Sequence, residues 1–170
     1  MLMFRGLALV AAAITTGLIA GLFYAYTCSV MPGLARTDDR TLISTMQQIN
    51  VAILNGWFAV CFGGALVLTV LSAALHLQEG GRAVLPWIVA GLVLYVVMLA
   101  ITMVIHVPLN TALDAAGDPD RITDLAAVRE QFEAAWVRWN LIRTLASVAA
   151  FGCLAWALVV YGRTSLPNGS

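Results

Sequence analysis

Polar and aromatic residues that could do chemistry lie at the ends of long apolar stretches of this sequence. His106 could act as a general base or as a ligand, because an imidazole exchanges a proton near neutral pH. Arg143 could hold an anion, and Asn50 and Asn110 could hydrogen-bond a carbonyl or phenol oxygen. These four are the candidate catalytic residues. Candidate substrate-binding residues, mostly aromatic, are Tyr24, Trp57, Trp136, Trp139 and Asn140.

Each candidate also has a purely structural interpretation. His106 could hydrogen-bond a neighbouring helix, and Arg143 could extend to lipid headgroups. Asn50 and Asn110 could cap helix ends. Trp139 precedes Arg143 by four residues, so a cation–π contact along one helix face is within reach. Such a pair could also bind a flat, anionic aromatic ligand.

Four apolar stretches predict the helices that must carry these residues. A transmembrane helix needs about 20 mostly apolar residues, and residues 6–31, 51–77, 85–107 and 139–161 meet that length. Pro32 and Pro108 are expected to end the first and third helices. The composition is 61% hydrophobic and 11% charged, whereas soluble domains have about 45–50% apolar and about 25% charged residues. The chain is therefore predicted to be an integral membrane protein.

The predicted fold class is all-α, a bundle of four transmembrane helices in one domain. That domain covers residues 1–163, and residues 164–170 are expected to form a flexible tail. Two longer connections, residues 32–50 and 108–138, lie on one side of the bundle, called here the loop face. A short amphipathic helix is predicted in each, at residues 41–49 and 124–136. In the second, one apolar stripe has helical spacing: Leu125, Val128, Phe132 and Trp136.

The side opposite the loop face is expected to hold both termini and the turn at residues 76–84. Five arginines lie on the loop face and three on the other side, which favours a cytoplasmic loop face in a plasma or bacterial inner membrane. Most candidate site residues lie toward the loop-face ends of the spans. Polar groups at membrane depth usually face the bundle interior or a cavity. The sequence therefore predicts one pocket, open toward the loop face and floored by apolar side chains.

Similar segments end the first and third predicted spans. Residues 30–34 read VMPGL and residues 106–110 read HVPLN, and each is followed by a partly helical loop. Two helical hairpins of similar design would produce this pattern, and so would chance similarity between apolar sequences.

Net charge and cysteine content exclude other classes of protein. The formal net charge is zero, so no basic surface for nucleic acid is expected. The three cysteines contain no C-x-x-C pair. His76 and His106 are expected at opposite ends of the bundle, about 30 Å apart, so they cannot share a metal within one chain. No metal site is predicted, although haem or a metal held through His106 stays open.

The chain resembles the anthrone oxygenase-like family of small four-span membrane proteins. The resemblance rests on short motifs that occur in order along the chain, at residues 20–26, 30–34, 46–50, 106–110 and 136–143. It implies oxygenation of anthrone-like phenolic carbon acids, with O2 as co-substrate and no cofactor. On this resemblance His106 would be the base and Arg143 the anion stabiliser. Asn50, Asn110 and Asn140 would be the hydrogen-bond donors, with Trp139 and Tyr24 as stacking walls.

Two other functions remain open at this point. The chain could be a non-catalytic membrane subunit that binds a ligand or assists assembly, or a haem- or metal-binding membrane protein. The expected partners are a lipophilic small molecule and the lipid bilayer, and a homo-oligomer stays open.

Overall fold

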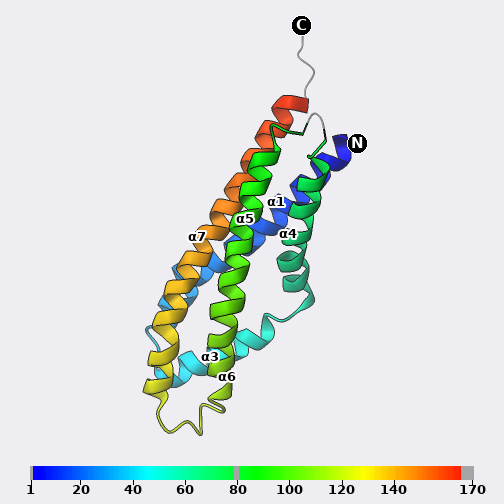
Figure 1. Ribbon diagram of the computed structural model, residues 1–170. Coiled ribbons are helices and arrows are strands. Elements are labelled where there is room, and N and C mark those ends of the chain that lie inside the picture. Colours follow the sequence, from blue (N-terminus) through cyan, green and yellow to red (C-terminus); the bar gives the residue numbers. More distant parts are fainter. Residues whose placement is uncertain (1, 79–80, 166–170) are drawn as a thin grey trace.

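The computed structural model describes residues 2–78 and 81–165, and every regular element within them is a helix (Figure 1). In chain order these are α1 (Leu2–Ala25), the π-helix η1 (Tyr26–Val30), α2 (Met31–Leu34), α3 (Asp39–Ala52), α4 (Gly56–Leu75), α5 (Leu85–Ile101), the π-helix η2 (Thr102–His106), α6 (Val107–Ala115) and α7 (Leu125–Ser165). The all-α fold class is confirmed.

Four helical runs among the described residues are long and apolar enough to cross a membrane, as predicted: Leu2–Leu34, Gly56–Leu75, Leu85–Ala115 and Leu125–Thr164. The first run joins α1, η1 and α2, and the third joins α5, η2 and α6. The N-terminal end of α1, the C-terminal end of α7 and the α4–α5 connection lie at one end of the bundle (Figure 1). Helices α3 and α6 lie at the other end. Thr164 and Ser165 of the predicted tail belong to α7, and residues 166–170 lie outside the described residues.

The predicted helix ends at Pro32 and Pro108 are wrong: each proline follows a π-helix and lies in a further α-helix, so the first run continues to Leu34 and the third to Ala115. A proline cannot donate the backbone hydrogen bond to the carbonyl four residues earlier, and its ring clashes with that carbonyl. The wider π turn accommodates this, since Met31 N–H bonds the Tyr26 carbonyl and Val107 N–H bonds the Thr102 carbonyl, each five residues back. Both sites have the same layout, a five-residue π-helix followed by X-Pro. This shared backbone feature supports two hairpins of similar design.

The second predicted loop helix is not separate from the fourth span. Residues 125–165 form one 41-residue helix, α7. The segment contains good helix formers and no glycine or proline between the two predicted pieces, so nothing breaks the helix at the membrane boundary. The apolar stripe is confirmed, because Phe132 and Trp136 are buried and Leu125 and Val128 pack against the same cluster.

The first loop helix exists as α3 and is longer than expected. Asp38 caps it by accepting hydrogen bonds from the Thr41 backbone N–H and hydroxyl, at 2.9 and 2.8 Å. These bonds hold the pKa of the Asp38 carboxyl below its usual range. The stabilisation from this cap is therefore present above the pKa of the unfolded chain and is lost as the pH falls through the folded pKa.

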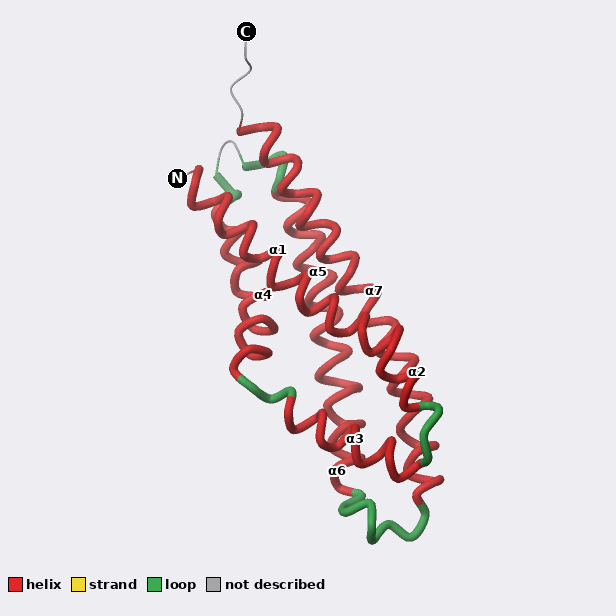
Figure 2. The backbone as a smooth tube through the Cα atoms, turned by 180° about the vertical axis from the view of Figure 1, so that it is seen from behind, coloured by secondary structure: helices red, strands yellow, loops and turns green. Residues whose placement is uncertain are grey.

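A set of buried apolar residues ties α3 across the loop-face end of the bundle. We call it the loop-face cluster: Met31, Leu42, Ile43, Met46, Leu113, Phe132 and Trp136. Two hydrogen bonds also hold α3 in place: Gln47 Nε2 donates to the carbonyls of Leu113 and Gly117, each at 2.9 Å. Arg129 on α7 bonds the Thr37 carbonyl and pairs with Asp39 and Glu133. Figure 2 shows α3 lying across this end beside α6.

Close packing of α5 on α7 predicts the first mutational effect. A Cβ at Gly91 would lie 3.2 Å from both the Ala150 carbonyl oxygen and Leu154 Cγ, whereas a Cβ at Gly64 on α4 would meet nothing within 4 Å. Gly91→Val is therefore expected to destabilise the bundle by about 1–3 kcal/mol through overpacking, and Gly64→Val is expected to be near neutral. Thermal unfolding of both variants in the same detergent checks this. Equal midpoints for the two variants would contradict the close α5–α7 contact.

Candidate functional site

A cavity of about 380 Å³ lies toward the loop-face end, between α1–η1, α3, the start of α4, η2–α6 and α7. That volume falls in the range of about 300–1,000 Å³ usual for small-molecule sites. Five of the nine residues predicted for the site line it: Asn50, His106, Asn110, Trp136 and Arg143. They come from four different elements, so the fold gathers them from across the chain.

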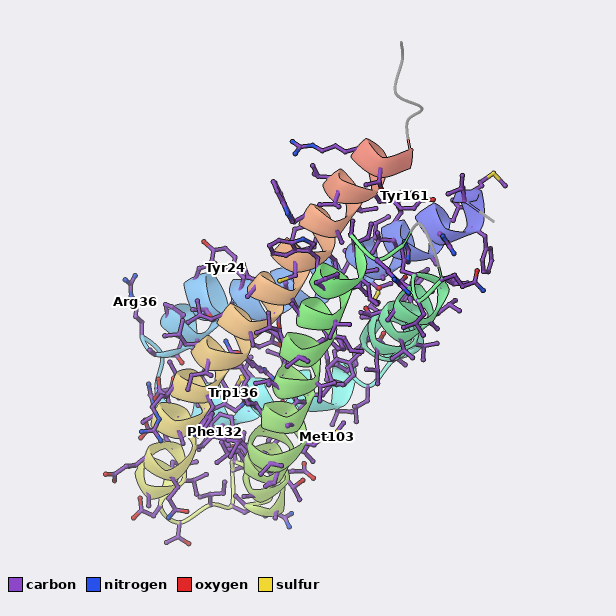
Figure 3. The ribbon with its side chains drawn as sticks, turned by 45° about the horizontal axis from the view of Figure 1, so that its top comes forward. Tyr24, Arg36, Met103, Phe132, Trp136 and Tyr161 are labelled. Carbon is purple, nitrogen blue, oxygen red and sulfur yellow. The ribbon has the colours of Figure 1, made fainter. Side chains whose placement is uncertain are left out.

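Trp136 on α7 is the centre of the aromatic wall. Its indole Nε1 donates to Asn110 Oδ1 on α6 at 3.0 Å. The His106 ring lies edge-on to it, with ring centroids 5.3 Å apart and an interplanar angle of 85°. Tyr26 packs on it with a centroid distance of 5.5 Å. Figure 3 shows Trp136 and Phe132 on the side of α7 that faces α5 and α6. The indole thus links the two π-helices η1 and η2.

Arg143 carries a buried positive charge against this wall. Its side chain is 6% exposed, and the guanidinium carbon lies 4.0 Å from the Phe23 ring centroid and 5.3 Å from that of Trp136. Its Nε donates to Asn140 Oδ1 at 2.9 Å. Among the described residues it has no carboxylate partner, and Glu133 pairs instead with Arg129. The alternative that Arg143 extends to lipid headgroups is therefore wrong.

Asn140 stands behind Arg143 and does not line the cavity. Its Nδ2 donates to the Phe23 carbonyl at 3.2 Å and to the Thr27 hydroxyl at 2.9 Å, and its side chain is buried. These bonds join α7 to the first helical run and fix the acceptor that holds the Arg143 guanidinium. The structure thus gives Asn140 a positioning role instead of the predicted contact with substrate.

The structure also places three aromatic candidates outside the cavity. Tyr24 is 57% exposed and Trp57 is 86% exposed, and Figure 3 shows Tyr24 projecting away from the bundle. The expected Trp139–Arg143 contact is not formed: Arg143 lies over Phe23 and Trp136, and the cation over Trp139 is Arg138, at 5.9 Å. On α7, seven residues or nearly two full turns separate Trp136 from Arg143, so the two residues lie on the same face of the helix.

Three buried polar atoms of the lining residues have no hydrogen-bond partner among the described residues: Nδ1 and Nε2 of His106 and Nδ2 of Asn50. Buried polar atoms in native proteins are nearly always paired, so each of these needs an explanation. The capping interpretation does not supply one. Asn50 and Asn110 lie inside α3 and α6, and Asn55 is the cap of α4.

Several lining residues were missed from the sequence. Most of them are apolar or aromatic, and they include Phe23, Tyr26, Phe58, Phe62, Thr102 and Gln47. Helical spacing could have found two, because Gln47 lies three residues before Asn50 and Thr102 lies four before His106. For Phe23 and Tyr26 no such signal exists, since their helix is apolar on nearly all sides.

The cavity opens at the side of the bundle rather than straight through the loop face. The loop-face cluster fills the space between α2, α3, α6 and α7, and the exposed lining residues belong to the last turn of α3, the α3–α4 connection and η2–α6. They are Val51, Leu54, Met103, Val107, Thr111 and Asp114. The opening therefore lies between the α3–α4 connection and α6, beside the part of the loop-face end that α3 covers.

Within residues 2–78 and 81–165, no group of three or more His, Cys, Asp or Glu side chains is arranged to hold a metal ion. His106 and Asp114 are the cavity-lining residues of those types. Cys28, Cys61 and Cys153 are free thiols.

Comparison with known proteins gives one family. A family model described as anthrone oxygenase matches residues 56–153, more than half of the 170 residues. The match runs from the first residue of α4 into α7 and contains His106, Asn110, Trp136 and Arg143. No curated protein and no solved structure matches the chain. The cavity residues and this match agree with the resemblance noted in the sequence, and the chain belongs to the anthrone oxygenase family.

Proposed function

We propose that this protein is a membrane-embedded oxygenase for a lipophilic aromatic or phenolic carbon acid of the anthrone type, with O2 as co-substrate and no cofactor. The observation that supports it best is the buried Arg143, which lacks a carboxylate partner among the described residues and lies against Phe23 and Trp136. A buried cation without a counter-ion is costly. A flat substrate anion in the aromatic-walled cavity would supply that counter-ion.

The reaction needs a base and a place for the negative charge. His106 would accept one proton from the acidic CH2 of the substrate on an unpaired ring nitrogen. The negative charge of the resulting carbanion is delocalised onto the carbonyl oxygen of the substrate. Arg143 would stabilise that oxygen by charge and hydrogen bonding. Asn50 Nδ2 is an unpaired donor for the same oxygen. Asn110 accepts from Trp136 through its Oδ1, so its Nδ2 would be the atom available to donate to the ligand.

Oxygen then reacts with the electron-rich anion. One electron passes from the carbanion to O2, which gives a substrate radical and superoxide; the two combine into a peroxide anion, which takes back the proton held by His106 and becomes a hydroperoxide. Loss of the second C–H proton and cleavage of the O–O bond convert the carbon to a carbonyl and release the other oxygen atom as water. The substrate CH2 is oxidised by four electrons and O2 is reduced by the same number, so no further reductant is required.

Turnover of the purified protein tests this proposal. Protein in lipid nanodiscs with anthrone is expected to consume one O2 per anthraquinone formed, and with 18O2 to place one labelled atom in the new carbonyl. A visible spectrum and metal analysis of the same sample check the cofactor. A Soret band or a stoichiometric metal would make His106 a ligand and contradict the cofactor-free reaction. Ligand binding without O2 consumption above the protein-free rate would favour a non-catalytic binding subunit.

A further inference from the structure

The side mouth of the cavity has apolar, exposed lips. On one side lie Val51 and Leu54, 69% and 80% exposed, and on the other lie Met103 and Val107, 57% and 46% exposed. Exposed apolar side chains around a cavity mouth are unfavourable in water and favourable in lipid. The mouth therefore has the chemistry of a surface that contacts hydrocarbon.

Both lips lie at the depth where the hydrocarbon core ends. The 20 residues of α4 rise about 30 Å, the thickness of that core, so its first residue Gly56 marks one boundary. From Leu85 at the start of α5 to Met103 the helix rises about 27 Å. The two helices meet at the opposite end through the α4–α5 connection (Figure 1). Leu54 and Met103, which line the same cavity, thus lie near a single membrane boundary.

The loop-face cluster blocks the route from water between α3 and α7. The loop-face cluster fills the space between α2, α3, α6 and α7, and Gln47 ties α3 to the end of α6. Arg129 further holds the start of α3 against α7 through Asp39. A ligand coming through this end would have to separate buried apolar side chains, whereas the side mouth requires no such rearrangement.

Trp136, His106 and Arg143 are buried at the inner end of the cavity, whereas Leu54 and Met103 are exposed at its mouth, where Thr111 and Asp114 add a polar edge on the α6 side. We propose that the side mouth is a lateral portal, through which the cavity takes from the bilayer aromatic ligands that carry a hydrocarbon tail. The ring lies against Trp136 and Arg143, and the tail lies between Leu54 and Met103. This inference uses the proposed function for the aromatic ring and is independent of the reaction.

Binding of two matched quinones tests the portal without requiring turnover. The probes are a hydroxyanthraquinone and the same ring with a dodecyl chain, added to protein in nanodiscs, with concentration expressed as mole fraction in the lipid to remove the effect of partitioning. The dissociation constants of the two quinones for wild-type protein are expected to agree within about threefold. The tail leaves one apolar environment, the lipid, for another, the portal, so its transfer changes the binding free energy little. Tenfold weaker binding of the tailed quinone, or no binding of either, would overturn the proposal.

Portal variants locate the tail. Leu54→Trp combined with Met103→Trp is expected to weaken the tailed quinone at least tenfold and the plain ring less than threefold. Both positions are exposed, so the larger side chains do not disturb a packed core. Val67→Trp is the control, since Val67 is 64% exposed on α4 and does not line the cavity. Equal behaviour of the double variant and the control contradicts the portal. Selective loss of the tailed ligand in a protein without oxygenase turnover supports the portal and refutes the proposed reaction.

Discussion

Arg143→Met is expected to lower kcat for anthrone oxidation by about 10²–10³, equivalent to about 3–4 kcal/mol of lost charge stabilisation in a dry site. The protein is expected to stay folded with a thermal midpoint close to that of wild type. The variant loses the hydrogen bond to Asn140 and the contacts with Phe23 and Trp136, and it also loses the penalty of a buried, uncompensated charge. Turnover and thermal unfolding measured on the same preparation check both parts.

Arg129→Met is the matched control, because Arg129 is an arginine on the same helix with a structural network. It bonds Glu133, Asp39 and the Thr37 carbonyl, and it does not line the cavity. Its loss is expected to lower the unfolding midpoint while each folded molecule keeps normal turnover. The opposite pattern, a stable Arg129 variant and an Arg143 variant with a lowered unfolding midpoint but normal turnover per folded molecule, contradicts the assignment of Arg143 to the anion.

The helices could be predicted because span length and hydropathy depend on composition over about 20 residues. Their ends could not, for two physical reasons. A proline normally stops a helix. Pro32 and Pro108 do not, because the π turn directly before each one makes room for the proline ring. Residues 125–138 are polar enough to leave the membrane and still strong enough helix formers to continue α7.

Site residues could be predicted on helices whose sequence shows which face is polar. On α7 a polar stripe contains Trp136, Asn140 and Arg143 at helical spacing, and the structure brings these three residues together. The first helix is apolar nearly all round, so the sequence cannot tell Tyr24 from its neighbours Phe23 and Tyr26. Trp57, at the start of α4, projects outward with 86% exposure, as aromatic residues at a membrane boundary often do.

The side mouth could not be predicted, because it depends on where α3 packs. The sequence shows α3 as a loop helix, but its position is set by distant partners such as Leu113 and Phe132 in the loop-face cluster. The paired π-helices likewise act through tertiary contacts. Tyr26 begins η1 and His106 ends η2, and both rings pack on Trp136. Single-turn π-helices are frequent at functional sites, and here they carry the proposed base and one wall.

His106→Phe is expected to lower turnover by about 10²–10⁴, the usual contribution of a general base. Phenylalanine keeps an aromatic ring at the position that meets Trp136 edge-on and removes two buried nitrogens that have no partner among the described residues. Removing unpaired buried polar atoms costs no hydrogen bond, so the unfolding midpoint is expected to stay equal or rise. Anthrone oxidation and thermal unfolding in the same detergent measure the two effects.

His76→Phe provides the matched control, since His76 is also a buried imidazole with an edge-on aromatic neighbour, Tyr161, at 5.6 Å. Its Nδ1 is within 2.7 Å of the Ser72 carbonyl, so its loss is expected to lower stability and leave turnover intact. His106→Ala with added imidazole separates a base from a structural ring. A freely diffusing base that enters the vacated space restores part of the turnover and a primary isotope effect on the substrate C–H bond, whereas a structural ring gives no rescue. Full turnover in His106→Phe would assign proton removal to another group, and the unpaired nitrogens would then require a ligand that is not the carbon acid.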